Sequence, residues 1–177
     1  MGTTGGACPG LTIFWGVFVA ERRPRVRVFT VCDDKFCWSS FETLSRRVGE
    51  IIGCSLDFRG FSRWYDEARE KLGKFGFGGV DLLVFDQFGD LEWLSEASKA
   101  LASEFGIKAR MLLSTRPKWE CEFFVRRSGE PVFPKPFGVE ELAKMYVTVL
   151  SSQLGLKGLR VYKPPKVFRG FVSSPVV

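Results

Sequence analysis

Apolar residues recur along this chain in two alternating periods, one typical of buried strands and the other of amphipathic helices. The run Val80–Phe85 is apolar except at Asp81, as expected of a strand buried on both faces of a parallel sheet. Comparable runs predict strands near residues 25–32, 54–58, 80–86, 109–115 and 131–135.

Between these runs, apolar residues at helical spacing predict five helices. We expect Asp90 to cap the third helix and Gly106 to end it. The expected second helix carries Phe61, Trp64, Ala68 and Leu72 on its apolar face and ends at Gly73, before a glycine-rich loop at 74–79. The predicted helices span about residues 41–53, 61–73, 90–106, 118–127 and 139–150. Strands that alternate with helices indicate an α/β fold with a doubly wound, parallel five-stranded sheet.

The apolar segment Leu11–Ala20 precedes this pattern. It is shorter than the roughly 20 residues of a membrane-spanning helix, and it lacks the basic start of a signal peptide. We therefore expect an added strand within an N-terminal extension, residues 1–24, ahead of the main domain at 25–154. In the expected sheet, the strand at 25–32 already has a parallel neighbour on each side and has no free edge. The sequence therefore does not show which strand the added strand would pair with.

The composition fits one domain in a reducing cytoplasm. The chain has 177 residues, of which 45% are apolar, enough for a single substantial core. Histidine and asparagine are absent and glutamine occurs only at 87 and 153, a pattern expected of a hyperthermophile. The five cysteines form no C-x-x-C pair, so we do not expect a structural zinc site, and we interpret Cys32 as a small buried apolar residue.

The net charge of +6 comes from the C-terminal part, because residues 142–177 contain six basic residues and no acidic one. A tail at 155–177 carries Lys157, Arg160, Lys163, Lys166 and Arg169. Together with the aromatic residues of the tail, these cations could bind nucleic acid. The alternative is a tail that is solvated or bound to a protein partner.

Polar residues stand where the predicted strands end. Because parallel strands end at the same edge of a sheet, we expect these side chains to share one crevice. They are Asp33, Asp34, Asp86, Ser114 and Lys135.

In this order and spacing, the chain resembles the receiver domains of response regulators. The resemblance covers about residues 25–154, and the steps from Asp34 to Asp86, Ser114 and Lys135 are 52, 28 and 21 residues. It implies that Asp86 accepts a phosphoryl group, that Ser114 binds this group and that Lys135 pairs with it. It also implies Mg²⁺ bound by Asp34, Asp86 and the carbonyl of Phe88, with Asp33 acting through water. A histidine kinase or an effector subunit would be the protein partner, and the domain would not be an enzyme in its own right.

The chain departs from the pattern of that family at two positions near the site. Gln87–Asp90 replaces the usual Met-Pro turn after the acceptor aspartate, and Val132 stands where an aromatic residue often lies three residues before the lysine. The alternative is therefore a degenerate receiver that binds a partner without phosphorylation. A homodimer is left open, and so is nucleic-acid binding through the tail.

Overall fold

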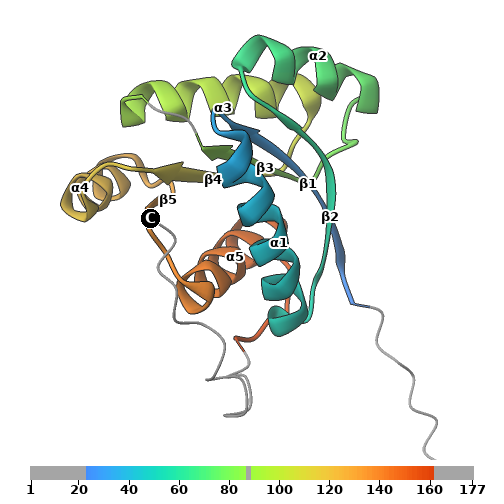
Figure 1. Cartoon of the computed structure of the whole chain (residues 1–177), viewed down its shortest axis with the longest axis vertical. Helices are drawn as coiled ribbons and strands as arrows, with labels where there is room; N and C mark the ends of the chain where they lie inside the picture. The colour runs from blue at the N-terminus through green and yellow to red at the C-terminus, as the bar shows by residue number, and fades with distance from the viewer. Residues whose placement is uncertain (1–22, 87–88, 162–177) are drawn as a thin grey trace, which may run out of the picture.

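The computed structural model describes residues 23–86 and 89–161, in which five strands alternate with five helices (Figure 1). The strands are β1 (Arg25–Cys32), β2 (Ser55–Ser62), β3 (Leu82–Asp86), β4 (Ala109–Ser114) and β5 (Val132–Pro134). The helices are α1 (Lys35–Ile52), α2 (Tyr65–Phe75), α3 (Leu91–Phe105), α4 (Lys118–Ser128) and α5 (Val139–Leu154). The alternation of element types expected from the sequence is confirmed.

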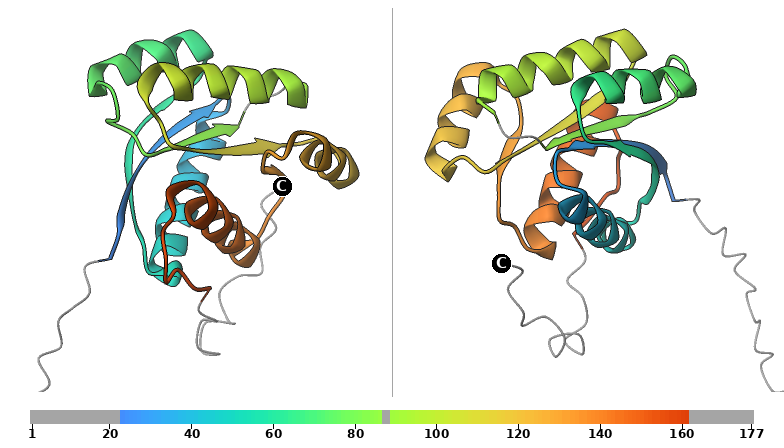
Figure 2. Two further views of the ribbon diagram at one scale, coloured as in Figure 1. Left: turned by 180° about the vertical axis from the view of Figure 1, so that it is seen from behind. Right: turned by 45° about the horizontal axis from the view of Figure 1, so that its top comes forward.

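All five strands are parallel and lie in the order β2-β1-β3-β4-β5. This arrangement is a doubly wound, flavodoxin-like α/β fold, as the hydrophobic pattern predicts. Helices α1 and α5 cover one face of the sheet, while α2 and α3 cover the other (Figure 2). Strand β1 lies between two parallel neighbours, so its carboxyl end is inside the sheet.

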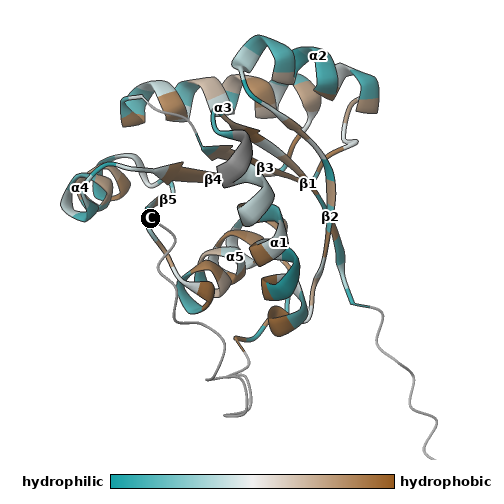
Figure 3. Ribbon diagram, viewed as in Figure 1, coloured by the Kyte–Doolittle hydropathy of each residue, from teal (hydrophilic) through white to brown (hydrophobic). Residues whose placement is uncertain are grey.

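The sheet has a core on each face because successive side chains of a strand point in opposite directions. In β3, Leu82 and Val84 pack with α1 and α5, whereas Leu83 and Phe85 pack with α2 and α3. All four are fully buried, which explains why this strand reads as a continuous apolar run. In Figure 3 the strands inside the sheet are mostly brown, and teal residues alternate with brown ones along the covering helices.

The expected second helix is wrong at both of its ends. Phe61 belongs to β2, where it pairs with Thr30 and its ring stacks on Trp38 with centroids 4.9 Å apart. The strand continues past Phe58 because its register shifts at Arg59, an irregularity that no spacing of apolar residues predicts. The helix begins at Tyr65 and passes through Gly73 to Phe75.

The ends of α3 are those that the sequence predicts. The Asp90 carboxylate accepts a hydrogen bond from the Trp93 backbone N–H at 2.6 Å, and Gly106 adopts the left-handed conformation with φ of 65°. Helix α4 likewise ends at a left-handed glycine, Gly129. The two left-handed glycines therefore begin the loops that lead into β4 and β5.

The structure describes only part of the N-terminal extension, residues 1–24, and only part of the C-terminal tail, residues 155–177. The predicted strand at 11–20 lies outside the described residues. At the other end, Leu156, Leu159 and Val161 pack against the core on the α1 and α5 face, so packed chain continues beyond α5. Within residues 23–86 and 89–161, no helix has both the length and the apolar character needed to cross a bilayer.

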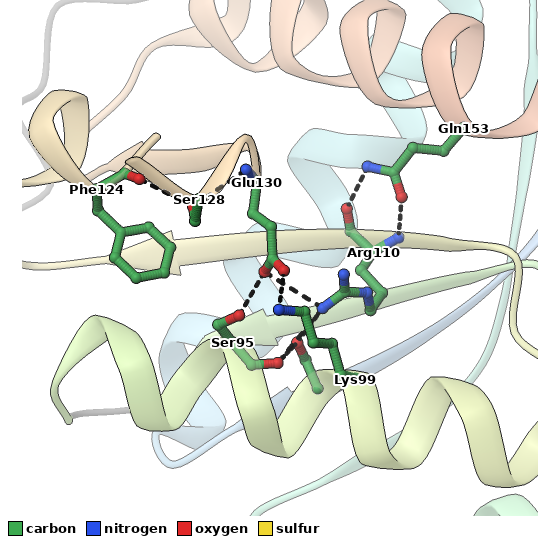
Figure 4. Close-up of polar contacts among 8 residues, drawn as sticks. Ser95, Lys99, Arg110, Phe124, Ser128, Glu130 and Gln153 are labelled. Carbon is green, nitrogen blue, oxygen red and sulfur yellow. Dashed lines mark hydrogen bonds and ion pairs between the residues drawn. The ribbon is translucent and has the colours of Figure 1, made fainter. Parts of the chain in front are cut away.

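A buried carboxylate ties the short strand β5 to α3 and β4 (Figure 4). Glu130, two residues before β5, accepts a hydrogen bond from the Ser95 hydroxyl and forms ion pairs with Lys99 and Arg110. Burial alone would raise the pKa of Glu130, but Lys99, Ser95 and Arg110 outweigh burial and hold it below its ordinary value. The approach to β5 is therefore anchored on the face that carries α3.

The side chain of Gln153 completes the edge of β4 where β5 is too short to reach (Figure 4). Strand β5 pairs only with Leu112–Ser114, which leaves the backbone of Arg110 without a strand partner on that side. The Gln153 amide accepts from the Arg110 N–H at 2.9 Å and donates to the Arg110 carbonyl at 3.0 Å. A side chain of α5 thus replaces the missing strand.

Replacing Gln153 with Ala should lower the free energy of unfolding by about 1–2 kcal/mol, because two partly buried backbone groups lose their partners. Gln153→Glu should have an intermediate effect, since a carboxylate accepts from the N–H but cannot donate to the carbonyl. Urea unfolding followed by circular dichroism measures both changes. Ser152→Ala is the matched control, because the Ser152 hydroxyl bonds only to backbone carbonyls of its own helix; an equal loss in Gln153→Ala and Ser152→Ala would contradict this role.

Candidate functional site

The pairing register aligns the carboxyl ends of four strands. Cys32 lies opposite Asp86, Asp86 opposite Leu113, and Leu113 opposite Phe133. The five polar residues singled out in the sequence follow or end these strands, so all five lie at the same edge of the sheet. The strand order reverses between β1 and β3, and in open α/β sheets ligands bind at the carboxyl edge beside that switch point.

An ion pair joins β3 to the end of β5 at this edge. The Lys135 ammonium lies 2.6 Å from Oδ1 of Asp86, with 22% of the lysine side chain and 6% of the aspartate side chain exposed. The Lys135 backbone N–H donates to the Ser114 carbonyl at 2.7 Å, which continues the β4–β5 ladder by one step. The pairing of β5 with β4 therefore positions Lys135 beside Asp86. The peptide bond between Lys135 and Pro136 is cis.

Cys32 is part of the same cluster, although its sequence context indicated only a buried apolar residue. Its Sγ lies 3.7 Å from Oδ2 of Asp86 and 3.3 Å from the carbonyl oxygen of Asp34. A thiol is a weak donor, so it supports the carboxylate without neutralising it. Asp86 thus contacts a cation through Oδ1 and a thiol through Oδ2.

The environment of Asp86 raises its pKa above the ordinary value of an aspartate. Burial is the main cause, because it disfavours the charged carboxylate, and repulsion from Asp33 acts in the same direction. The charge and the hydrogen bond of Lys135 oppose this effect, but they do not cancel it. Asp86 is therefore a carboxylate whose charge depends on the cation beside it.

The acidic pair after β1 is split between two environments. Asp33 is half-buried and close enough to Asp86 to perturb its pKa, whereas Asp34 is exposed. The Asp34 carbonyl accepts the Trp38 N–H at 3.0 Å, so this residue lies at the N-cap of α1, directly before Lys35. The two aspartates therefore differ in both exposure and local role.

Arg63 is a residue of this edge that the sequence analysis missed. Its Nε donates to the Asp33 carbonyl at 2.9 Å, and its guanidinium lies 5.3 Å from the centroid of the Trp64 ring. Arg63 directly follows β2, so it reaches the carboxyl edge by the same rule as the other site residues. The signal was hidden because the expected β2 ended at Phe58.

Ser114 is buried at the end of β4, where its Oγ accepts the Arg116 backbone N–H at 3.1 Å. This bond shapes the turn between β4 and α4. A hydroxyl can rotate its proton toward a new acceptor while it keeps such a bond. Ser114 therefore links the carboxyl edge to the loop that leads into α4.

The described donors partly fit a magnesium ion. Mg²⁺ is commonly held by one or two carboxylates, with water and phosphate oxygens completing its shell. Asp33 and Asp86 supply two interacting carboxylates, but residues 23–86 and 89–161 contain no group of three or more acidic or thiol side chains that could hold a metal. Phe88, whose carbonyl the resemblance implies as a ligand, lies outside the described residues.

The basic tail is described only at its start. Lys157 and Arg160 are exposed, as a nucleic-acid contact requires. Lys163, Lys166 and Arg169 lie outside the described residues. Nucleic-acid binding by the tail stays a prediction.

Comparison with known proteins identifies no relative. No protein-family model matches the chain, and no curated protein matches it. The strand order shows a flavodoxin-like fold, and the resemblance to receiver domains stays a prediction from the residues at the strand ends.

Replacing Lys135 with Met should make stability strongly dependent on pH. The substitution removes the charge and the hydrogen bond that oppose burial, so the pKa of Asp86 in the folded protein should rise further. A folded-state pKa above the unfolded value gives stability that is present at low pH and is lost as the pH rises. We expect the variant to match the wild type near about pH 3 and to fall about 2 kcal/mol below it near about pH 7.

Urea unfolding across this pH range measures the difference between the two proteins. Lys118→Met is the control, because Lys118 is 78% exposed and its ion pair with Glu122 is loose. A stability loss in Lys135→Met that is the same at every pH would contradict the coupling of Lys135 to Asp86.

Proposed function

We propose that this protein is a receiver-like signalling domain that accepts a phosphoryl group on Asp86 and transmits the change to a protein partner. The observation that carries the proposal is the 2.6 Å contact between Lys135 and Asp86 at the carboxyl edge of a five-stranded parallel sheet. A buried carboxylate next to a cation suits a nucleophile that becomes more negative after it reacts.

In the proposed phosphoryl transfer, one bond to phosphorus forms as another breaks. A carboxylate oxygen of Asp86 would bond to the phosphorus of a phosphorylated donor as the bond between phosphorus and the leaving atom breaks. The leaving group keeps the electron pair and takes a proton from solvent. A phosphohistidine on a kinase is the donor that the resemblance implies.

Each residue at the edge has a defined part in this proposal. Lys135 opposes the effect of burial on the charge of Asp86 before the reaction and would pair with the phosphoryl oxygens afterwards. Ser114 would donate its hydroxyl proton to one of these oxygens. Asp86 and the acidic pair Asp33 and Asp34 would hold Mg²⁺, which would supply positive charge to the transferring group.

A second candidate function follows from Val132. This residue is buried in the core on the α2 and α3 face, so the position three residues before Lys135 has no aromatic ring that could change its exposure. A degenerate receiver would keep the fold as a binding module and would not use Asp86. In that case Asp86→Ala should leave the affinity for a protein partner unchanged.

Phosphoryl acceptance can be tested with ¹⁵N-labelled protein titrated with Mg²⁺ and then with beryllium fluoride, which mimics a phosphoryl group. We expect amide shifts concentrated around Asp86, Ser114 and Lys135, and we expect Asp86→Asn to abolish them. Glu50→Gln is the control, since Glu50 is exposed in the last turn of α1, which leads into the start of β2 at the opposite edge of the sheet. Shifts that are absent at millimolar Mg²⁺, or that persist in Asp86→Asn, would rule out the phosphoacceptor and leave the degenerate module.

A further inference from the structure

Helix α4 has apolar residues on two of its faces. Cys121 and Phe124 are buried against the rest of the domain. Trp119 and Phe123 stand four residues apart on the outer side and are 69% and 63% exposed. Residues four apart lie next to each other on a helix surface, so the two rings form one exposed aromatic patch.

This patch borders a groove between α4 and the start of α3. The groove has a volume of about 250 Å³, and its apolar lining consists of Leu91, Trp119, Phe123 and Phe124. Helix α4 lies beyond β5, at the outer end of the molecule (Figure 1). Large aromatic rings that remain exposed beside a groove mark a surface that another molecule covers.

The two walls of the groove differ in net charge. The wall formed by the start of α3 contributes two acidic residues, Asp90 and Glu92. The α4 side contributes Arg116 and Arg127 near the two ends of the helix together with one acid, Glu120, which lies 3.8 Å from Arg116, so this side is basic on balance. Within one molecule, Arg127 pairs with Glu92, and both side chains are more than half exposed. Exposed pairs of this kind contribute little to folding and can exchange partners at small cost.

We propose that the occupant of this groove is a second copy of the chain, placed by a two-fold axis. In such a dimer the same patch serves both partners, so it must be complementary to itself. Opposite charges on the two walls meet this condition, because the acidic wall of one copy would face the basic wall of the other. An acidic or a basic partner would instead favour a groove lined by one sign of charge.

At the centre of this interface, Trp119 and Phe123 would pack against the same residues of the second copy. Buried aromatic residues at the centre of an interface usually carry most of the binding free energy. The arrangement does not depend on the proposed function, because the groove residues are separate from Asp86 and Lys135. The dimer would form whether or not Asp86 accepts a phosphoryl group.

Sedimentation equilibrium of the full chain tests this inference directly. We expect a dimer whose dissociation constant weakens by at least roughly 30-fold when either Trp119 or Phe123 is replaced by Ser, as for the loss of a hot spot. Phe77→Ser is the control, since Phe77 is 81% exposed but lies in the loop between α2 and β3. Circular dichroism verifies that each variant is folded.

Charge exchange separates this dimer from other modes of association. Arg127→Glu and Glu92→Arg each place like charges across the two-fold axis, so each variant alone should be monomeric. An equimolar mixture of the two variants should form a heterodimer, because each subunit then presents the charge that the other lacks. A monomeric wild-type chain, a dimer unaffected by the serine substitutions, or a mixture that stays monomeric would overturn the proposal.

Discussion

The Asp86 carboxylate is held in the interior because the Lys135 ammonium reaches it from the end of another strand. Burial and the neighbouring Asp33 both disfavour its charge, and Lys135 opposes them across a 2.6 Å contact. The contact depends on the sheet, since Asp86 ends β3 and Lys135 directly follows β5, two strands away, with β4 between them. Parallel strands are therefore the constraint from which the site follows: an antiparallel strand would carry its terminal residue to the opposite edge.

Much of this fold can be predicted from the sequence, because its signals are local. The apolar run Val80–Phe85 predicts a strand buried on both faces, which the structure has at Leu82–Asp86. Asp90 and Gly106 mark the ends of α3 by capping chemistry that needs no tertiary contact. The boundary between β2 and α2 could not be predicted in this way. Phe61 fits a helical spacing with Trp64 and Ala68, and only the register shift at Arg59 and the ring of Trp38 assign it to the strand.

The residues of the site divide in the same way: local sequence signals predict some of them, and the others depend on tertiary contacts. The sequence predicts that Lys135 and Asp86 lie together because each stands at the end of an apolar run whose limit is clear in the sequence. Arg63 was missed because the end of β2 was misplaced, and Cys32 was missed because a buried thiol beside a carboxylate has the same sequence signature as a buried apolar residue. Contacts that depend on the orientation of a side chain can be identified only from the three-dimensional structure. Ser114 is an example, since its bond to the Arg116 N–H links the carboxyl edge to the α4 groove.

The most direct test of the account is a titration of the Asp86 carboxyl carbon, followed by ¹³C NMR in the wild-type protein. We expect a midpoint above the ordinary aspartate pKa of about 3.9, because burial and Asp33 outweigh the attraction of Lys135. We also expect the midpoint to fall when Asp33 is replaced by Asn. A midpoint at or below the ordinary value would contradict a carboxylate buried at this edge, and so would a midpoint that does not respond to Asp33.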